Sequence, residues 1–342
     1  MRLGKIMNRS ALAVLALLCL LLSACRKDLC YNHFRAVNVM TQWEKSWERD
    51  YGRRWSANWD SARWEHEYDE FLPGVPEGMT MILYEDSKES SKNFFGPDGG
   101  TFMIGEGRHS MLLYNNDTRY IVFDDLASAP SAKASTTTRT RSSLKELHQD
   151  ERTINPPDVL YGAYLPDIPE VQLHGNFDAD VTMRPLVYTY LVRFGISKGA
   201  EYVSLARGAL AGMAESVMLR DGSTSDDTAT ILFDCKVKEW GAEADVRSFG
   251  VAGFPDKYYG RASSGEGEDR HYTLNLEILL NNGRMRTFNF DVTDQMADQP
   301  RGGIIEVGGI ELGEEDISNS SGFDVNVSDW GEYEDIDLPI VH

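Results

Sequence analysis

Basic residues are scarce in this sequence of 342 residues. It contains 34 lysines and arginines against 54 aspartates and glutamates, which gives a formal net charge of −20 at pH 7. A chain with this charge repels the phosphates of DNA and RNA and the headgroups of anionic lipids. The composition therefore excludes nucleic-acid binding as the function, and it fits a body held clear of a membrane surface.

Cysteine is also scarce, and its four positions limit the possible disulfides. Cys19 lies in an N-terminal apolar segment and Cys25 directly follows that segment, which leaves Cys30 and Cys235. These two could pair in an oxidising, exported setting. Cys235 lies in a strand-like run and is expected to point inward, so a buried free thiol remains the alternative.

Catalytic motifs are missing. No two of the seven histidines lie within four residues of each other, so the paired-histidine zinc motif cannot form. Residues 195–199 match Gly-x-Ser-x-Gly, but strand-like runs on both sides favour a hairpin turn over a nucleophile elbow. The acidic clusters lack the spacing of a calcium loop. The sequence therefore predicts a non-catalytic protein with no metal and no cofactor.

The N-terminal segment has the three parts of a secretory signal. Arg2, Lys5 and Arg9 form a basic start, residues 11–22 form an apolar stretch, and the small residues Ser23 and Ala24 follow. Twelve apolar residues are too few to span a membrane, which favours a cleaved signal peptide.

Cys25 changes the expected outcome of that cleavage. The run Leu21-Leu22-Ser23-Ala24-Cys25 resembles the lipobox of bacterial lipoproteins, in which the cysteine receives the lipid and becomes the new N-terminus. We therefore expect residues 1–24 to be a lipoprotein signal peptide and Cys25 to carry acyl chains such as palmitate. Arg26 after the cysteine favours anchoring to outer-membrane lipid, and the sequence leaves open whether the chain is exposed on the cell surface.

The rest of the chain reads mostly as short strands. Residues 79–84, 101–104, 110–114 and 119–123 are apolar runs separated by turn residues. In residues 230–238, apolar and polar side chains alternate, as in a strand with one buried face. A second alternating pair, 272–280 and 288–292, is joined by Asn282-Gly283, a sequence typical of a type I′ turn. This pattern predicts antiparallel β-sandwiches.

The predicted organisation is two domains, 25–175 and 176–342, because the chain is longer than one average domain. Residues 127–143 are rich in alanine, serine and threonine without an apolar period, which predicts a flexible exposed loop. Residues 209–219 are the best candidate for a helix, since Leu210, Met213 and Val217 recur at helical spacing.

Residues 43–71 contain an unusual density of aromatic side chains. Trp43, Trp47, Tyr51, Trp55 and Trp59 recur at every fourth position. They could lie along one helical face, or the segment could be an irregular excursion over a sheet. The rings could form a packing layer, or a partly exposed surface that stacks on a sugar or a protein partner. Trp47, Trp55 and Trp59 are the candidate contacts for the second possibility.

Several short patterns in a fixed order carry a resemblance to a known family. In chain order they lie at residues 26–33, 37–39, 75–79, 99–102, 107–109, 113–116, 156–162, 207–213 and 330. Together they resemble the fimbrillin-type lipoproteins of Bacteroidota, specifically the anchor-like subunits. The resemblance implies two tandem transthyretin-like antiparallel β-sandwich domains, no catalysis, and partners among fimbrial shaft or related surface proteins.

The resemblance also implies assembly by strand exchange, in which a strand of one subunit completes the sheet of another. Ile336, Leu338 and Ile340 alternate near the C-terminus and form the candidate exchange segment. The same residues could instead form the last strand of this chain's own sheet, at an edge because of Pro339. The expected function is a lipid-anchored fimbrial anchor, assembly or adhesion subunit; the alternative is a surface glycan-binding lipoprotein that uses the tryptophan-rich segment.

Overall fold

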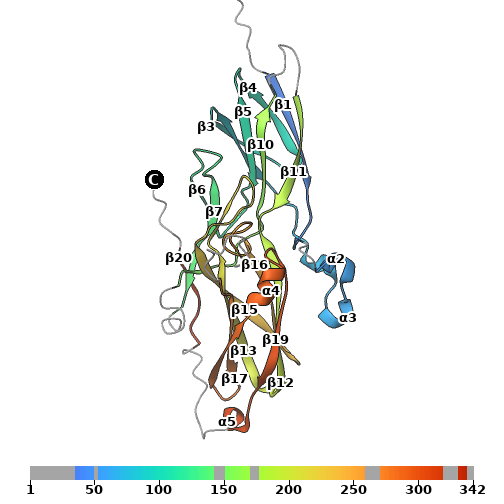
Figure 1. Ribbon diagram of the computed structural model, residues 1–342, viewed down its shortest axis with the longest axis vertical. Coiled ribbons are helices and arrows are strands. Elements are labelled where there is room, and N and C mark those ends of the chain that lie inside the picture. The colour runs from blue at the N-terminus through green and yellow to red at the C-terminus, as the bar shows by residue number, and fades with distance from the viewer. Residues whose placement is uncertain are drawn as a thin grey trace, which may run out of the picture.

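The computed structural model describes residues 35–49, 53–141, 151–169, 177–258, 270–318 and 330–336. The molecule is elongated, with two large β-sheets placed end to end and a small third sheet between them (Figure 1). The helices in the described residues are short: α2 (Trp55–Asn58), α3 (Ser61–Trp64), α4 (Thr293–Asp298), α5 (Glu314–Ile317), and the 3-10 turns η1 (Tyr68–Phe71) and η3 (Ala200–Tyr202). The predicted all-β fold is confirmed.

The first sheet curls round its own core. In spatial order its strands are β3 (Lys88–Phe95), β2 (Met79–Glu85), β5 (His109–Asn115), β10 (Tyr161–Ile168), β11 (Phe177–Pro185), β1 (Arg35–Trp43) and β4 (Gly99–Ile104). Its two ends approach each other, because Gly96 bridges to Gly99 and the Phe95 and Phe102 rings lie 6.2 Å apart. The sheet also contains a parallel pair, β1 with β11, among its antiparallel neighbours.

The second sheet repeats this plan. Its main path is β18 (Met285–Asp291), β17 (Thr273–Leu280), β13 (Val203–Ala214), β15 (Thr228–Lys238), β16 (Gly241–Ser248), β12 (Tyr188–Lys198) and β19 (Gly303–Glu311), with β12 and β19 parallel. Alternate residues such as Val192, Phe194, Leu274 and Leu276 point into one core. The alternation predicted a buried face for β15 and β17, and these strands have it.

The β17–β18 hairpin forms where Asn282-Gly283 predicted one, but with a different turn. The amide of Leu280 donates to the carbonyl of Arg284 at 2.9 Å, so the loop contains three residues. Gly283 has a φ of 80°. Asn282 lacks the positive φ that a type I′ turn would also require at this position. The turn is therefore the three-residue kind with glycine in the left-handed position.

The small middle sheet joins the two halves of the chain. It consists of β6 (Ile121–Asp124), β7 (Lys133–Thr136) and β14 (Ser216–Met218). Its core combines Ile82 and Tyr84 of β2 with Val217 and Leu219 from the second half. Strand β2 is thus buried on both faces, which accounts for its continuous apolar run.

The prediction of a flexible loop at residues 127–143 is wrong over the described residues, which end at Arg141. Strands β7 and β8 (Thr138–Thr140) occupy this segment, and Ala134 and Thr136 are completely buried. Small and β-branched side chains can pack closely in a narrow space between sheets, so the absence of large apolar residues did not prevent burial. Strand β8 continues through β9 (Thr153–Ile154) to β15 of the second sheet.

The change from the first sheet to the second falls later than the boundary predicted at residue 176. Strand β11 pairs with β1 and β10 of the first sheet through Pro185, and β12 begins the second sheet at Tyr188.

The predicted helix at 209–219 is wrong. Strand β13 runs through residue 214, and its pairing with β15 shifts register between Leu210 and Met213. This bulge inserts an extra residue, and Gly212 within it has a φ of 87°. Leu210 and Met213 therefore face the same core at a spacing of three, which imitates the period of a helix.

Two glutamines close the free edge of β19. Gln295 of α4 donates to the carbonyl of Glu306 at 3.0 Å and accepts from its amide at 3.0 Å. Gln299 donates to the carbonyl of Ile304 and accepts from its amide at 3.0 Å. Each side-chain amide thus imitates the backbone of a neighbouring strand, which removes the unpaired groups through which an edge can join another chain.

We expect Gln299→Glu to lower the free energy of unfolding by about 1–3 kcal/mol, because the buried carbonyl of Ile304 loses its donor. Urea unfolding at neutral pH measures the change. Gln295→Glu is the matched control: it removes the same kind of donor at a position that is only half buried. A Gln299 variant as stable as the parent chain would contradict the edge-closing role.

Candidate interaction sites

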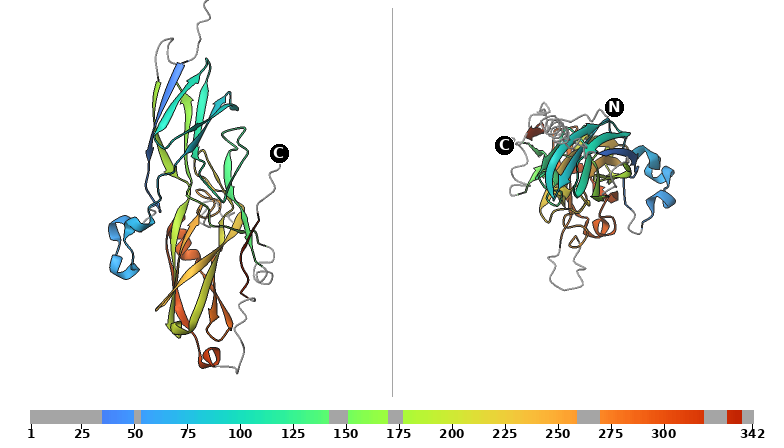
Figure 2. Two further views of the ribbon diagram at one scale, coloured as in Figure 1. Left: turned by 180° about the vertical axis from the view of Figure 1, so that it is seen from behind. Right: turned by 90° about the horizontal axis from the view of Figure 1, so that it is seen from above.

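The aromatic segment predicted as a possible binding surface forms an arm that leaves the first sheet after β1. We call residues 44–49 and 53–71 the aromatic arm. Its start is fixed by backbone hydrogen bonds: the carbonyl of Trp47 accepts from the amide of Thr189 at 2.8 Å, and the amide of Arg49 donates to the carbonyl of Arg301 at 2.8 Å. Helices α2 and α3 then lie beside the second half of the molecule (Figures 1 and 2).

The rings of the arm pack against one another. The Trp47 ring lies 5.7 Å from Trp59, 5.2 Å from Tyr68 and 5.1 Å from Phe71, between ring centroids. The Tyr68 hydroxyl donates to the carboxylate of Glu48 at 2.9 Å, and burial together with that carboxylate raises the pKa of Tyr68. The arm is thus an irregular excursion with its own small core, and not one long helical face.

The arm covers the outer face of the second sheet. Leu191 of β12 and Ile304 of β19 point away from the main core and pack with Trp64, against which Trp55 and Trp59 also lie. Strand β12 is consequently buried on both faces over most of its length. The aromatic density therefore serves packing between the arm and the sheet.

The three tryptophans predicted as glycan or partner contacts are not presented together on the surface. Trp47 is only 1% exposed, so its role as a contact is a wrong prediction. Trp55 and Trp59 are half buried, and their indole nitrogens already donate to Gln299 Oε1 at 3.2 Å and to the carbonyl of His66 at 2.8 Å. These donors are used within the chain, so no stacking platform of three rings is formed.

His66 fastens the far end of the arm to the sheet. Its Nδ1 lies 2.9 Å from Glu70 Oε2, and its Nε2 lies 2.8 Å from Glu243 Oε1. A neutral imidazole has only one N–H, whereas this position offers a carboxylate acceptor to each nitrogen. Burial alone would lower the pKa of His66, but the hydrogen bonds with Glu243 and Glu70 outweigh it and raise the pKa.

Other charged groups face the same position. Lys238 Nζ lies 3.4 Å from Glu243 Oε1, and Arg193 Nε lies 3.2 Å from Glu243 Oε2. Burial raises the pKa of Asp245, which lies two residues after Glu243 in β16. Glu243 is 2% exposed in its side chain, so its charge is held by these cations and by His66 instead of by water.

We expect the stabilising effect of His66 to depend on pH. The imidazolium contributes stability that is fully present below the unfolded pKa of about 6.5 and is lost as the pH rises through the raised folded pKa. The melting-temperature difference between the parent chain and His66→Gln should therefore shrink from pH 5.5 to pH 8.5. His271→Gln, at an exposed histidine, is the control. A difference that stays constant with pH would contradict the charged contact.

The C-terminal candidate strand is described only in part. Ile336 is the last residue of β20 (Glu334–Ile336), whereas Leu338 and Ile340 lie outside the described residues. Strand β20 pairs antiparallel with β8 of the same chain, with Asp335 opposite Arg139. Three residues form this pairing, and the side chain of Ile336 is 46% exposed. The described end of the chain is thus a short strand added at a sheet edge.

Aromatic and charged contacts hold the segment before β20 in place. The Arg207 guanidinium lies 3.9 Å from the centre of the Trp330 ring and donates to the carbonyl of that residue. Tyr333 packs on Ala209 and Leu232, and its hydroxyl donates to the carbonyl of Phe233 at 3.3 Å. The segment therefore covers the outer face of β13 and β15, on the opposite layer of the sandwich from the aromatic arm.

A buried charge network under this segment was not predicted from the sequence. Glu277 of β17 accepts from Arg207 Nη2 at 2.9 Å and also from Arg141. All three side chains are less than a tenth exposed. The sequence offered one signal. Arg207 and Glu277 are charged residues near the centres of the otherwise apolar strands β13 and β17, and a charge at such a position is unusual without a partner on the neighbouring strand.

We expect Tyr333→Ala to loosen β20 without unfolding the sheet, because Tyr333 supplies an apolar contact next to a strand for which the structure describes three paired residues. Hydrogen exchange of the amides in β8 should accelerate by at least about tenfold in this variant, which corresponds to a loss of roughly 1.4 kcal/mol. Glu332→Ala, at an exposed neighbour, is the control. Unchanged protection of β8 in the tyrosine variant would contradict the anchoring role.

The structure adds further findings on catalytic, metal and membrane features. Ser197 of the Gly-x-Ser-x-Gly run lies near the end of β12, and its hydroxyl donates to the carbonyl of Ile310 at 3.1 Å. Strand β12 pairs with β16 and β19 and not with β13, so the run is neither an elbow nor a hairpin turn. The described residues contain no group of three potential metal ligands and no helix that is long and apolar enough to cross a membrane.

The lipid and disulfide predictions fall on residues that the structure does not describe. The signal segment 1–24, Cys25 and Cys30 all lie outside the described residues. Cys235 lies half buried in β15, and burial raises the pKa of its thiol. The choice between a buried thiol and a Cys30–Cys235 disulfide therefore stays open.

Comparison with known proteins now gives this fold a context. Residues 68–234 match the family described as Domain of unknown function (DUF5119), a stretch that runs from the end of the aromatic arm into β15. A search of curated proteins found no match. A crystal structure described as a putative adhesin from Bacteroides ovatus aligns with a TM-score of 0.57 at 19% identity, covering 81% of this chain and 92% of that chain.

Two further solved structures align more loosely. The fimbrial anchor protein Mfa2 from Porphyromonas gingivalis gives a TM-score of 0.42 at 10% identity, covering 76% of this chain and 83% of that one. A fimbrial assembly protein from Parabacteroides distasonis gives 0.35 at 10% identity, covering 81% and 90%. The alignment with the Bacteroides ovatus protein shows a shared fold, so the fold that the sequence resemblance implied is confirmed.

Proposed function

We propose that this chain is a non-catalytic fimbrial or adhesion subunit of the cell surface, anchored to outer-membrane lipid through acylated Cys25. The lipobox-like run that ends at Cys25 supports the anchor. The fold shared with the Bacteroides ovatus protein supports the structural role. Residues 1–24 would be removed as the signal peptide, leaving two β-sandwich domains as the mature protein.

The observation that carries the proposed assembly role is the pairing of β20 with β8. The structure describes three paired residues of this edge strand; a pairing of that length can be displaced at low cost, and main-chain hydrogen bonds then become available to another subunit. Ile336 would lead the exchange segment, with Leu338 and Ile340 continuing its alternation. A fimbrial shaft protein or a related surface protein would be the partner.

Two other sheet edges are less suited to this role. The edge of β19 is closed by Gln295 and Gln299, and β3 approaches β4 where the first sheet curls on itself. The alternative function, glycan capture by Trp47, Trp55 and Trp59, has less support, because these side chains pack within the chain.

A photo-crosslinking amino acid at Ile336 tests the assembly role in native outer membranes. We expect a crosslink to a second surface protein from Ile336 and none from Val75, which has a similar exposure of 44% and precedes β2 of the first sheet. Crosslinks from Ile336 that stay within the chain would contradict partner binding at this strand.

The anchor is tested separately, by membrane partitioning of Cys25→Ser. We expect the variant to leave the membrane fraction after a high-salt wash, because acyl chains contribute about 0.8 kcal/mol for each buried methylene. A variant that still partitions with membranes would show that the tether lies elsewhere, whatever the crosslinking result.

A further inference from the structure

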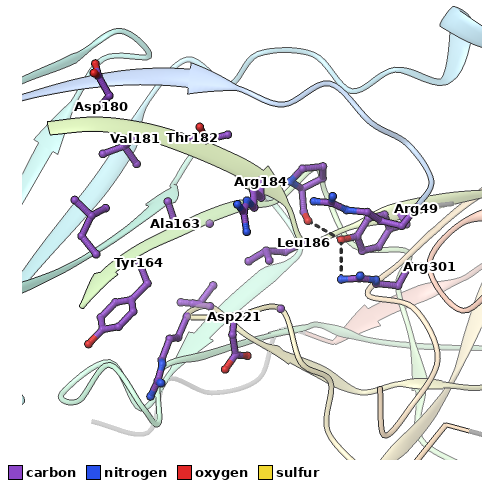
Figure 3. Close-up of a pocket in the computed structure, with 17 residues that line it drawn as sticks. Arg49, Ala163, Tyr164, Asp180, Val181, Thr182, Arg184, Leu186, Asp221 and Arg301 are labelled. Carbon is purple, nitrogen blue, oxygen red and sulfur yellow. Dashed lines mark hydrogen bonds between the residues drawn. The ribbon is translucent and has the colours of Figure 1, made fainter. Parts of the chain in front are cut away.

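A cleft of about 500 Å³ lies between the first sheet and the beginning of the second. One wall is formed by β10 and β11, which pair only at Tyr161–Gly162 and then separate toward their other neighbours. The opposite wall contains the turn at residues 219–222 (Figure 3). Because this turn closes the cleft on one side, the cleft is a pocket of the size that small ligands occupy, and not an open strand edge.

The charge of the cleft is opposite to that of the chain. Four arginines line it, Arg49, Arg184, Arg220 and Arg301, against two aspartates, Asp180 and Asp221. The whole chain has 54 acidic residues and 34 lysines and arginines. A local excess of cations in so acidic a protein concentrates anions at this position and repels them from the rest of the surface.

Two of the arginines have no carboxylate partner in the part of the chain that the structure describes. Arg184 and Arg220 are both exposed, and the contact of Arg220 is with the Tyr164 ring, 5.4 Å from its centre. Asp221, next to Arg220 in the sequence, accepts from the amide and hydroxyl of Ser223. The guanidinium groups of Arg184 and Arg220 are therefore available to a ligand.

The other two arginines are held in place at one end of the cleft. Arg49 Nη2 lies 3.0 Å from Glu44 Oε1, and Arg301 Nη1 donates to the Tyr188 hydroxyl at 3.4 Å. In Figure 3, Arg49 and Arg301 lie near Arg184, around Leu186. Positioned guanidinium groups recognise carboxylate and sulfate oxygens in a bidentate manner.

Glycines let Leu186 and the turn at residues 219–222 pack closely on β10, which forms the floor of the cleft. A Cβ at Gly162 would lie 2.7 Å from Leu186 Cδ1 and 2.9 Å from the carbonyl oxygen of Leu219. Gly222 has a φ of 74°, a conformation that favours glycine. Beside this floor, the half-buried Tyr164 offers a ring face with a polar hydroxyl, the kind of surface on which a sugar ring stacks.

We propose that this cleft binds an anionic saccharide, a sugar unit that carries carboxylate or sulfate groups. The arginines would pair with the acidic groups and Tyr164 would contact the ring. This inference does not depend on the lipid anchor or on strand exchange, and it places sugar recognition at the junction of the sheets and not at the tryptophans of the aromatic arm.

Isothermal titration of the full chain tests the proposal. The probes are trigalacturonate, a chondroitin sulfate disaccharide, a neutral galactan trisaccharide and an acidic hexapeptide of aspartate and glutamate. We expect binding of one or both anionic sugars that weakens with added salt, and no binding of the neutral sugar. The two anionic probes distinguish carboxylate from sulfate recognition.

The double variant Arg184→Gln, Arg220→Gln locates the site. Loss of charge-assisted hydrogen bonds should weaken sugar binding by at least about tenfold. Arg108→Gln is the matched control, because Arg108 is exposed and lies outside the cleft, and it should leave the affinity within about twofold. No binding of either anionic sugar, equal affinity in the double variant, or tighter binding of the acidic peptide would each overturn the proposal.

Discussion

The structure depends above all on the packing of the aromatic arm on the outer face of the second sheet. The chain leaves the first sheet after β1, lays Trp64 on Leu191 and Ile304, and returns to begin β2. Truncating a buried tryptophan of this kind costs about 3–5 kcal/mol, so the arm fastens the two halves firmly. The core of the small middle sheet, which combines Ile82 with Val217, also joins the two halves. The two sheets are therefore joined by packing as well as by the chain between β11 and β12.

On each outer face of the second sandwich, a buried glutamate–arginine pair lies beside a tryptophan ring. On one face, Glu243 is buried with Arg193, whose guanidinium lies 4.1 Å from the centre of the Trp240 ring. On the other, Glu277 is buried with Arg207, which lies over Trp330. A buried ion pair gains little net stability because both charges lose their water. Such pairs instead fix where an irregular segment must dock, since a displaced segment would leave the charges without partners.

The sequence was most informative where one physical rule acts alone. Alternation predicted β15 and β17, because successive side chains of a strand point to opposite faces. It failed at β13, where the bulge at Gly212 changed the spacing, at β7, where small residues are buried, and at β8, which is half buried. The tryptophans show the same limit. Their density favoured a packing layer over a binding surface without deciding between them, and the position of β12 beneath them shows that they pack.

The sequence by itself determined the all-β class, several strands of the two large sheets and the hairpin at Asn282-Gly283, because these follow from local patterning and turn chemistry. Its N-terminal run also carries the predicted lipid site at Cys25. Tertiary structure alone decided which edges are closed, which charges are buried and where the arginines gather. Gln295 and Glu306 lie on separate elements, and so do Arg184 and Arg220. Whether the two members of each pair come together depends on the path of the whole backbone.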